Sequence, residues 1–130
     1  MLYLIMGNKK PYYLEKCRKL AERSDLLHKH GALLVKNGSI LGYGNNRYGK
    51  KKGIYKHSLH AEFSCISKSL LIYNLHEISN STLYVVRVNN SGEFKLSAPC
   101  NKCIETMIKY GVKKVYFSVD DSKIGEIKFK

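Results

Sequence analysis

Three stretches of the chain place apolar residues three and four positions apart, which is the spacing of an amphipathic helix. These stretches are Pro11–Arg23, His60–Tyr73 and Cys100–Tyr110. Pro11 suits the first turn of the first helix, where a missing N–H is tolerated, and Gly111 suits a cap after the third. The pattern therefore predicts three helices with other structure between them.

An antiparallel hairpin is predicted between the first two helices. Two apolar runs, Gly31–Lys36 and Ser39–Gly44, flank Asn37-Gly38, which is the strongest two-residue hairpin signal. The following stretch, Asn45–His57, is rich in Gly, Lys and Tyr and is predicted to be a loop.

Further strands are predicted where β-branched and apolar residues run together. They are Thr82–Val88, Val112–Val119 and Ile124–Lys130, and Met1–Met6 is either a short strand or a packing segment. The short turn Asp120–Ser122 favours an antiparallel last strand. Helices interleaved with strands predict an α/β fold in which helices flank a sheet.

Composition narrows the class of protein. With 130 residues, 44% of them hydrophobic, the chain can form a core, and we expect a single domain over residues 1–130. Met1–Met6 is followed by Gly7, Asn8 and Lys9, so this apolar run is too short for a signal peptide or a membrane span. We therefore expect a protein of the cytosol or nucleus without membrane contact.

The formal net charge of +13 favours a polyanionic partner or an anionic substrate. The basic stretch Arg47–Lys56 contains Tyr48 and Tyr55, and it would suit single-stranded nucleic acid through backbone contacts and base stacking. Two alternatives stay open. The loop can be an ordinary solvated segment, and the abundant Lys, Asn, Ile and Tyr can reflect an AT-rich genome.

Two short motifs carry the candidate chemistry, His60-Ala61-Glu62 and Pro99-Cys100-Asn101-Lys102-Cys103. A catalytic Zn²⁺ takes three protein ligands and leaves one position open, and His60, Cys100 and Cys103 supply three. Each motif opens a predicted helix, so two helix starts can close around one ion. Glu62 need not bind metal, because beside the zinc it can carry a proton from water to a leaving amine.

Other interpretations of these residues are weaker. A structural zinc site would need a fourth protein ligand, for which His30, His57 and Cys65 are candidates. The C-x-x-C pair can also belong to a redox protein, and Cys17 can pair with Cys65 in a disulfide. The upstream H-x-E and the lack of a secretory signal argue against both.

With these residues in place, the chain resembles the cytidine deaminase-like superfamily from about Pro11 to Val119; the combined H-x-E and P-C-x-x-C signature is that of zinc deaminases. The resemblance implies a three-layer α/β/α sandwich with a mixed five-stranded sheet. It also implies that His60, Cys100 and Cys103 hold zinc and that Glu62 is the acid/base. Members of this superfamily usually form dimers or tetramers, so a homo-oligomer is expected.

The resemblance also implies substrate-binding positions. The backbone of Ala61 would face the base, and the carbonyl of Ala98 would accept a bond from the exocyclic amine. Asn46, in a G-x-G-x-N-R stretch, would contact the sugar or base, although a left-handed turn is an alternative for this asparagine. Ala32 lies in the segment that lines the base pocket in the superfamily.

The motifs indicate the type of reaction more narrowly than they indicate the substrate. His60 as first ligand departs from the cysteine typical of free-cytidine deaminases, whereas Ser97-Ala98-Pro99-Cys100 is closer to cytosine-acting members. We expect hydrolytic conversion of cytosine to uracil in a nucleoside or nucleotide, with release of ammonia. The alternatives are a DNA or RNA cytidine deaminase, a tRNA-adenosine deaminase, and a non-catalytic zinc-binding subunit.

Overall fold

The computed structural model describes residues 2–5, 11–48 and 58–129. The helices are α1 (Pro11–Glu22), α2 (Ala61–Leu70), α3 (Leu75–Ile78) and α4 (Asn101–Lys109). The strands are β1 (Leu2–Ile5), β2 (Lys29–Lys36), β3 (Ser39–Asn45), β4 (Arg47–Tyr48), β5 (Ser58–Leu59), β6 (Thr82–Val88), β7 (Phe94–Lys95), β8 (Lys114–Asp120) and β9 (Lys123–Lys128). The three expected long helices and all five expected strands are present.

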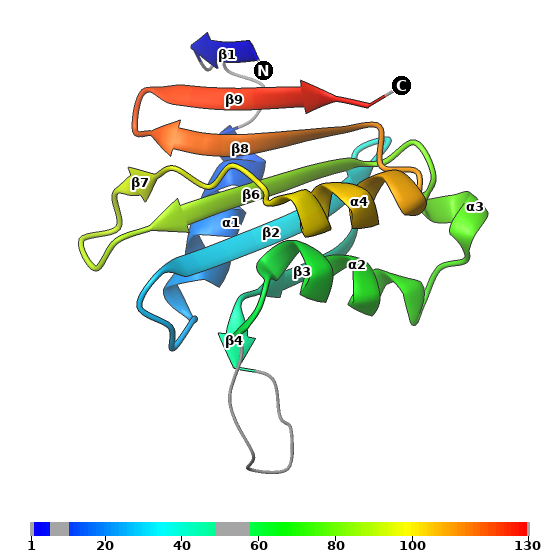
Figure 1. Ribbon diagram of the computed structural model, residues 1–130, viewed down its shortest axis with the longest axis horizontal. Helices are drawn as coiled ribbons and strands as arrows, with labels where there is room; N and C mark the ends of the chain where they lie inside the picture. The colour runs from blue at the N-terminus through cyan, green and yellow to red at the C-terminus, as the bar shows by residue number, and fades with distance from the viewer. Residues whose placement is uncertain (1, 6–10, 49–57, 130) are drawn as a thin grey trace.

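The main sheet has the strand order β1-β9-β8-β6-β2-β3, with β7 paired to β6 (Figure 1). Strands β6 and β8 are parallel and the other neighbours are antiparallel, so the sheet is mixed as expected. It is larger than the five-stranded sheet predicted from the sequence. Residues Leu2–Ile5 extend it beyond β9, and the short β7 adds to β6.

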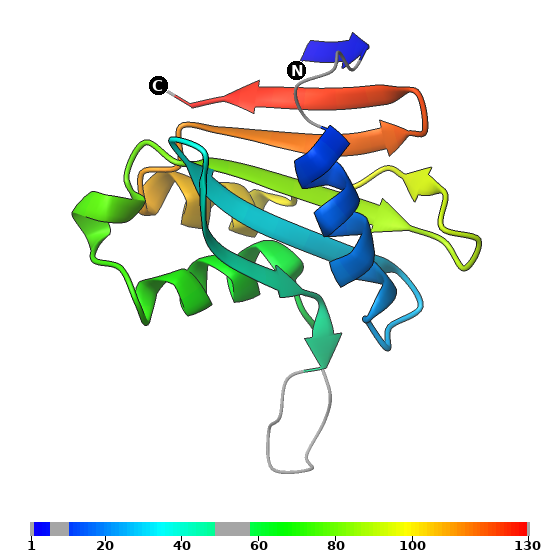
Figure 2. The same ribbon diagram turned by 180° about the vertical axis from the view of Figure 1, so that it is seen from behind.

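Helices cover both faces of the sheet, which confirms the three-layer arrangement. Helix α1 lies on one face, and α2 and α4 lie on the other (Figures 1 and 2). Alternate residues of β2 serve the two layers. Ala32 and Leu34 pack in the core cluster with α2 and α4, whereas Leu33 and Val35 pack in the cluster with α1. The alternative of a Cys17–Cys65 disulfide, already disfavoured by the sequence, is excluded because both thiols are free and lie in different core clusters.

The β2–β3 hairpin turns at Asn37-Gly38, as the sequence predicts. Both residues have positive φ, 51° and 81°, which a tight two-residue hairpin turn requires at its central positions. The last hairpin, β8–β9, is antiparallel, as the short turn before it indicated.

The second helix is shorter than its apolar pattern indicates, because α2 ends at Leu70 and not near Tyr73. A separate turn of helix, α3, follows it. Asn74 and Glu77 form a reciprocal capping box there, with bonds of 2.8 and 2.9 Å. The Asn-x-x-Glu spacing is the sequence signal for this extra turn of helix.

Part of the segment predicted as a loop over Asn45–His57 is a strand. Arg47–Tyr48 forms β4, which pairs with β5, just after this segment, in a two-residue antiparallel ladder. Residues 49–57 lie outside the described part of the chain, and with them most of the basic stretch Arg47–Lys56. In the part that the structure describes, no helix is both long and apolar enough to cross a bilayer.

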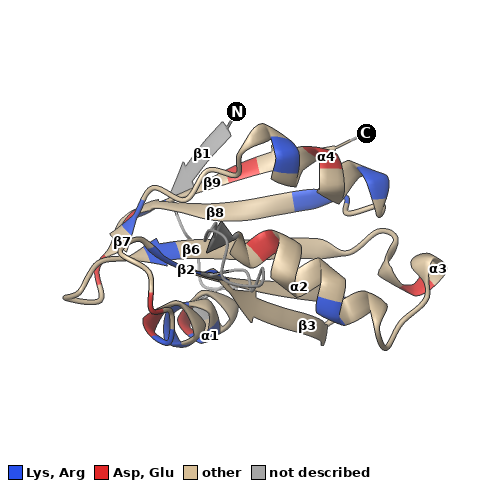
Figure 3. Ribbon diagram, turned by 60° about the horizontal axis from the view of Figure 1, so that its bottom comes forward, with Lys and Arg blue, Asp and Glu red and all other residues tan. Residues whose placement is uncertain are grey.

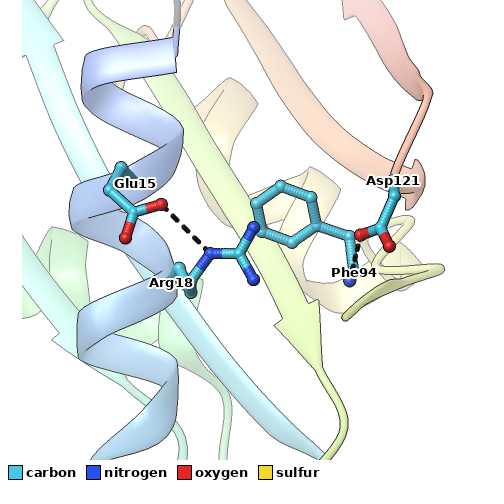
Figure 4. Close-up of polar contacts among 4 residues, drawn as sticks. All are labelled: Glu15, Arg18, Phe94 and Asp121. Carbon is cyan, nitrogen blue, oxygen red and sulfur yellow. Dashed lines mark hydrogen bonds and ion pairs between the residues drawn. The ribbon is translucent and has the colours of Figure 1, made fainter. Parts of the chain in front are cut away.

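Strand β7 is held against α1 and the β8–β9 turn by polar contacts (Figure 4). The Arg18 guanidinium lies 4.2 Å from the centre of the Phe94 ring, and its Nε lies 3.1 Å from a Glu15 oxygen. The backbone nitrogen of Phe94 donates a 2.7 Å hydrogen bond to Asp121. These contacts join three segments distant in sequence, so local patterns could not have predicted β7.

Candidate metal centre

Two helix starts meet on the α2/α4 side of the sheet and bring the two motifs together. His60 is the residue before α2 and Cys100 the residue before α4, and both have extended backbones. Neither side chain forms a capping hydrogen bond, so both remain available as ligands. Cys103 lies in the first turn of α4 and is buried.

The ligand atoms of these three residues have the spacing of a zinc site. His60 Nδ1 lies 3.3 Å from Cys103 Sγ and 3.5 Å from Cys100 Sγ, and all three atoms lie within 4.8 Å of one another. Bond lengths to zinc of about 2.0 Å for nitrogen and 2.3 Å for sulfur place tetrahedral N and S ligands about 3.5 Å apart. The donor set therefore fits a three-ligand zinc centre with one position left for another group.

The chemistry of the thiols agrees with a bound cation. Burial raises the pKa of Cys103, and the neighbouring Glu62 and Cys100 raise it further. Deprotonation of this thiol needs a compensating positive charge, which a divalent ion provides. Cys65, one candidate for a fourth ligand, is buried in the core and is not in this group, and His57 lies outside the described residues.

A serine network fixes the segment that leads into α4. The Ser97 hydroxyl lies 2.8 Å from the Ser118 hydroxyl and donates to the Val85 carbonyl at 3.1 Å. The backbone nitrogen of Ser97 also bonds to the Ser118 carbonyl at 2.9 Å. Ser97 is 3% exposed, so these bonds are shielded from water. They set the position of Ala98 and Cys100 relative to the central strands.

Glu62 lies in the first turn of α2, two residues after His60, with only 4% of its surface exposed. Burial disfavours the carboxylate and raises the pKa of Glu62 to about 7. A carboxyl group with a pKa in this range can both accept and release a proton near neutral pH, which is the property of a general acid/base.

A cavity of about 400 Å³ opens beside the metal-ligand group. One wall comes from the two helix starts and the segment before α4, and the other comes from residues 26–30 and the end of β3. The lining residues are Leu26, Leu27, His28, His30, Asn46, His60, Ala61, Glu62, Ala98 and Cys100. A volume of this size suits a small organic molecule such as a nucleoside or nucleotide.

Three of the four expected substrate-binding residues, Asn46, Ala61 and Ala98, line this cavity. Ala32 does not. Its side chain is fully buried in the core cluster that also contains Ala61 and Cys103, so it packs beneath residues of the site and does not line the cavity itself.

The side chain of Asn46 organises the opposite wall. Its oxygen accepts a 2.9 Å hydrogen bond from the backbone nitrogen of His30, and its nitrogen donates to the His28 carbonyl. The Ser24 hydroxyl in turn donates to the Asn46 carbonyl at 2.9 Å. Asn46 is not among the residues with positive φ, so the left-handed-turn alternative does not apply.

His28 and His30 were not predicted as cavity residues. Both precede Gly31 at alternate positions, so they continue the side of β2 on which Ala32 and Leu34 lie. Burial, together with Arg87, His60 and His28 nearby, lowers the pKa of His30 to about 4. The period-two spacing of these histidines ahead of the strand was the signal that could have found them.

The comparisons with known proteins agree with this geometry. Residues 8–119 match the family model described as the cytidine and deoxycytidylate deaminase zinc-binding region. A crystal structure of dCMP deaminase from the cyanophage S-TIM5 shares 30% sequence identity over 85% of each chain, with a TM-score of 0.57. Cytidine deaminase from Burkholderia pseudomallei shares 22% identity over 95% of this chain and 93% of that one, with a TM-score of 0.70. No match was found among curated proteins.

Proposed function

The chain belongs to the cytidine and deoxycytidylate deaminase family, whose members are zinc-dependent hydrolytic deaminases, and on that premise we propose that it converts cytosine to uracil in a free nucleoside or nucleotide. The reaction consumes water and releases ammonia. The observation that carries the proposal is that buried Glu62 lines one cavity of nucleoside size together with His60 and Cys100, two members of the His60/Cys100/Cys103 group.

The roles of the residues follow from their positions. His60, Cys100 and Cys103 would hold zinc, which in such a site supplies a water-derived nucleophile at neutral pH. Glu62 takes one proton from the attacking water as the new C–O bond forms at the amine-bearing ring carbon, and passes it to the adjacent ring nitrogen. It then moves the second proton of that water from the new hydroxyl to the amine as the C–N bond breaks, so the ring keeps a C=O and an N–H and the amine leaves as ammonia.

The cavity walls would orient the base for this exchange. Ala98 lines the cavity together with Cys100, and its carbonyl would accept a hydrogen bond from the exocyclic amine. Ala61 lines the cavity between His60 and Glu62, and its backbone would face the base. Asn46 lines the cavity and holds residues 28–30 in place through its side-chain bonds, and it would contact the sugar or base.

A free nucleoside or nucleotide is the substrate class that the similarities favour. The 30%-identical phage relative is a dCMP deaminase, and the Burkholderia neighbour is a cytidine deaminase. Most of the basic stretch Arg47–Lys56, which was expected to contact nucleic acid, lies outside the described residues. A non-catalytic role is disfavoured because Glu62 and all three ligands are retained.

A substrate panel with ammonia release as readout tests the proposal. Zinc-loaded protein would be assayed with cytidine, deoxycytidine, their 5′-monophosphates, adenosine, guanosine and a cytosine-containing oligonucleotide. We expect turnover of a cytosine nucleoside or nucleotide, and a loss of at least about a hundredfold in Glu62→Ala with zinc retained. Turnover of the oligonucleotide alone, or of a purine alone, would refute the proposed substrate class.

A further inference from the structure

A basic side chain sits at the rim of the cavity and is not used by the chemistry described above. The Arg87 guanidinium, from β6, contacts His28, with 2.7 Å between Arg87 Nη2 and His28 Nδ1. His28 itself lines the cavity, on the wall opposite the metal-ligand group. Arg87 therefore lies next to a residue of the same cavity that Glu62 lines.

The sheet directs Arg87 to the cavity side. Arg87 is paired with His30 across β6 and β2 and with Lys95 across β6 and β7. Directly opposed residues of antiparallel strands project from the same face. Leu83 and Val85 precede Arg87 at alternate positions, and both pack in the core cluster on the α2/α4 face. The basic positions of β6 and β7 are visible beside each other in Figure 3.

The hydrogen bond fixes the donor pattern at the rim. A guanidinium only donates, so His28 Nδ1 must accept, and the proton of the neutral ring is on Nε2. Arg87 has further N–H groups with which it can bind an anion, and His28 Nε2–H is another donor on the same wall. Two donors held together in this way match the oxygens of a phosphate.

The charge of Arg87 has no acidic partner in the described part of the chain. The ion pairs found there are Arg18–Glu15 and Lys114–Glu126. Arg87 is nevertheless partly buried, with Lys95 as its cross-strand neighbour, so positive charge accumulates at this rim. A partly buried cation without a carboxylate gains most from an anionic ligand.

We propose that Arg87 and His28 form a subsite for the 5′-phosphate of the substrate, so that the preferred substrate is a cytosine nucleoside monophosphate and not the free nucleoside. This inference rests on the proposed function. The base lies at Glu62, and the phosphate extends to the outer wall. Among the described residues that line the cavity or contact its lining, the Arg87–His28 pair supplies two donors, which suits one terminal phosphate, whereas a polynucleotide would need a continuous basic groove.

The test compares nucleotide with nucleoside in matched variants. The ratio of kcat/KM for CMP or dCMP to that for the corresponding nucleoside would be measured for wild type, Arg87→Gln, Arg87→Lys and Arg23→Gln. Arg23 is an exposed arginine just after α1 that is not among the residues lining the cavity, and it serves as the matched control. Affinities for the products UMP and uridine, from calorimetry, give a readout that does not need turnover.

We expect the wild-type ratio to be about 10 to 100, the contribution of a charge-assisted hydrogen-bond pair. Arg87→Gln should lower both the kcat/KM ratio and the UMP-to-uridine affinity ratio by about tenfold or more, Arg87→Lys should lower them less, and Arg23→Gln should preserve them. Zinc content and thermal midpoint of each variant show that the protein is folded.

The outcomes separate this inference from the proposed function. A wild-type ratio near one, or a high ratio that survives in Arg87→Gln, overturns the phosphate subsite while cytosine deamination stands. If neither nucleotide nor nucleoside is converted, the proposed function fails, and the UMP-to-uridine affinity ratio then decides the subsite alone. An oligonucleotide converted with a higher kcat/KM than the monophosphate overturns it in favour of a polynucleotide.

Discussion

The side-chain oxygen of Asn46 accepts a hydrogen bond from the backbone nitrogen of His30, at 2.9 Å, along the cavity wall opposite the metal-ligand group. With the bond to the His28 carbonyl, it clamps residues 28–30 against the end of β3. The same residue was expected to touch substrate. Its bonds show that it also builds the wall on which His28 and His30 are carried.

Replacement of Asn46 by alanine should therefore cost stability as well as activity. Two backbone groups of a partly buried segment would lose their partner, so we expect the free energy of unfolding to fall by about 1–3 kcal/mol. Urea denaturation measures the change. Asn45→Ala is the matched control, because the side chain of Asn45 donates one hydrogen bond, to the Leu20 carbonyl at 3.2 Å. A smaller loss for Asn46→Ala than for Asn45→Ala would contradict this role.

Zinc binding should depend on Cys103 and not on Cys65, although both cysteines are buried in the same core cluster. Cys103→Ala removes one of three ligands and should abolish stoichiometric zinc, whereas Cys65→Ala should retain about one zinc per chain. Metal analysis by mass spectrometry after dialysis checks both. Both truncations also remove similar packing, so metal-free forms of the two variants should have comparable stability.

Added zinc should then raise the thermal midpoint of Cys65→Ala and leave that of Cys103→Ala nearly unchanged, because only a folded state that binds the ion is stabilised by it. Equal zinc content in the two variants would show that the His60/Cys100/Cys103 group is not the metal site.

Features set by local sequence were the ones that could be predicted. Asn37-Gly38 has the backbone freedom that its turn demands, and the two motifs each open a helix, so the hairpin and the metal-ligand group followed from short stretches. The residues at which helices begin and end were harder to predict. The apolar stripe of α2 continues to Tyr73, but the chain leaves the helix at Leu70 to start the Asn74-capped α3.

Features set by tertiary pairing could not be predicted. Strand β7 exists because Phe94 and Lys95 find β6, and its anchor to Asp121 joins residues 27 positions apart. Arg87 was visible as a strand residue, but its position beside His28 depends on which strand lies next to β6. No local sequence pattern predicts the strand order. The contact between Arg87 and His28 beside the cavity could therefore be found only in the structure.

Gly31 should tolerate no side chain, because α1 crosses β2 at this point. A Cβ on Gly31 would collide with the Cys17 carbonyl oxygen and lie 2.6 Å from the Ala21 nitrogen, both in the α1 backbone. Gly31→Ala should therefore lower the free energy of unfolding by about 3 kcal/mol or more, since a helix and not a side chain must move. Gly38→Ala is the control: its Cβ would meet nothing, and its cost is limited to about 1 kcal/mol from the positive φ of 81°. Chemical denaturation of both variants decides the prediction, and a larger loss at Gly38 would contradict it.

The pH dependence of stability should carry a contribution from His30. Burial lowers the pKa of His30 from 6.5 to about 4, and the groups that face it are His28, Arg87 and His60. Between pH 6.5 and pH 4 the unfolded chain binds a proton at this histidine that the folded chain does not. The free energy of unfolding should thus have its full His30 contribution above pH 6.5 and lose it as the pH falls toward 4.

Replacement of His30 by glutamine removes this titration, so wild type should lose more stability than His30→Gln between pH 7.5 and pH 5 in zinc-saturated urea titrations. His76→Gln, which changes an exposed histidine on α3, should follow the wild-type profile. Parallel profiles for wild type and His30→Gln would mean that His30 titrates alike in the folded and unfolded chain, because only a difference in bound protons makes the free energy of unfolding depend on pH.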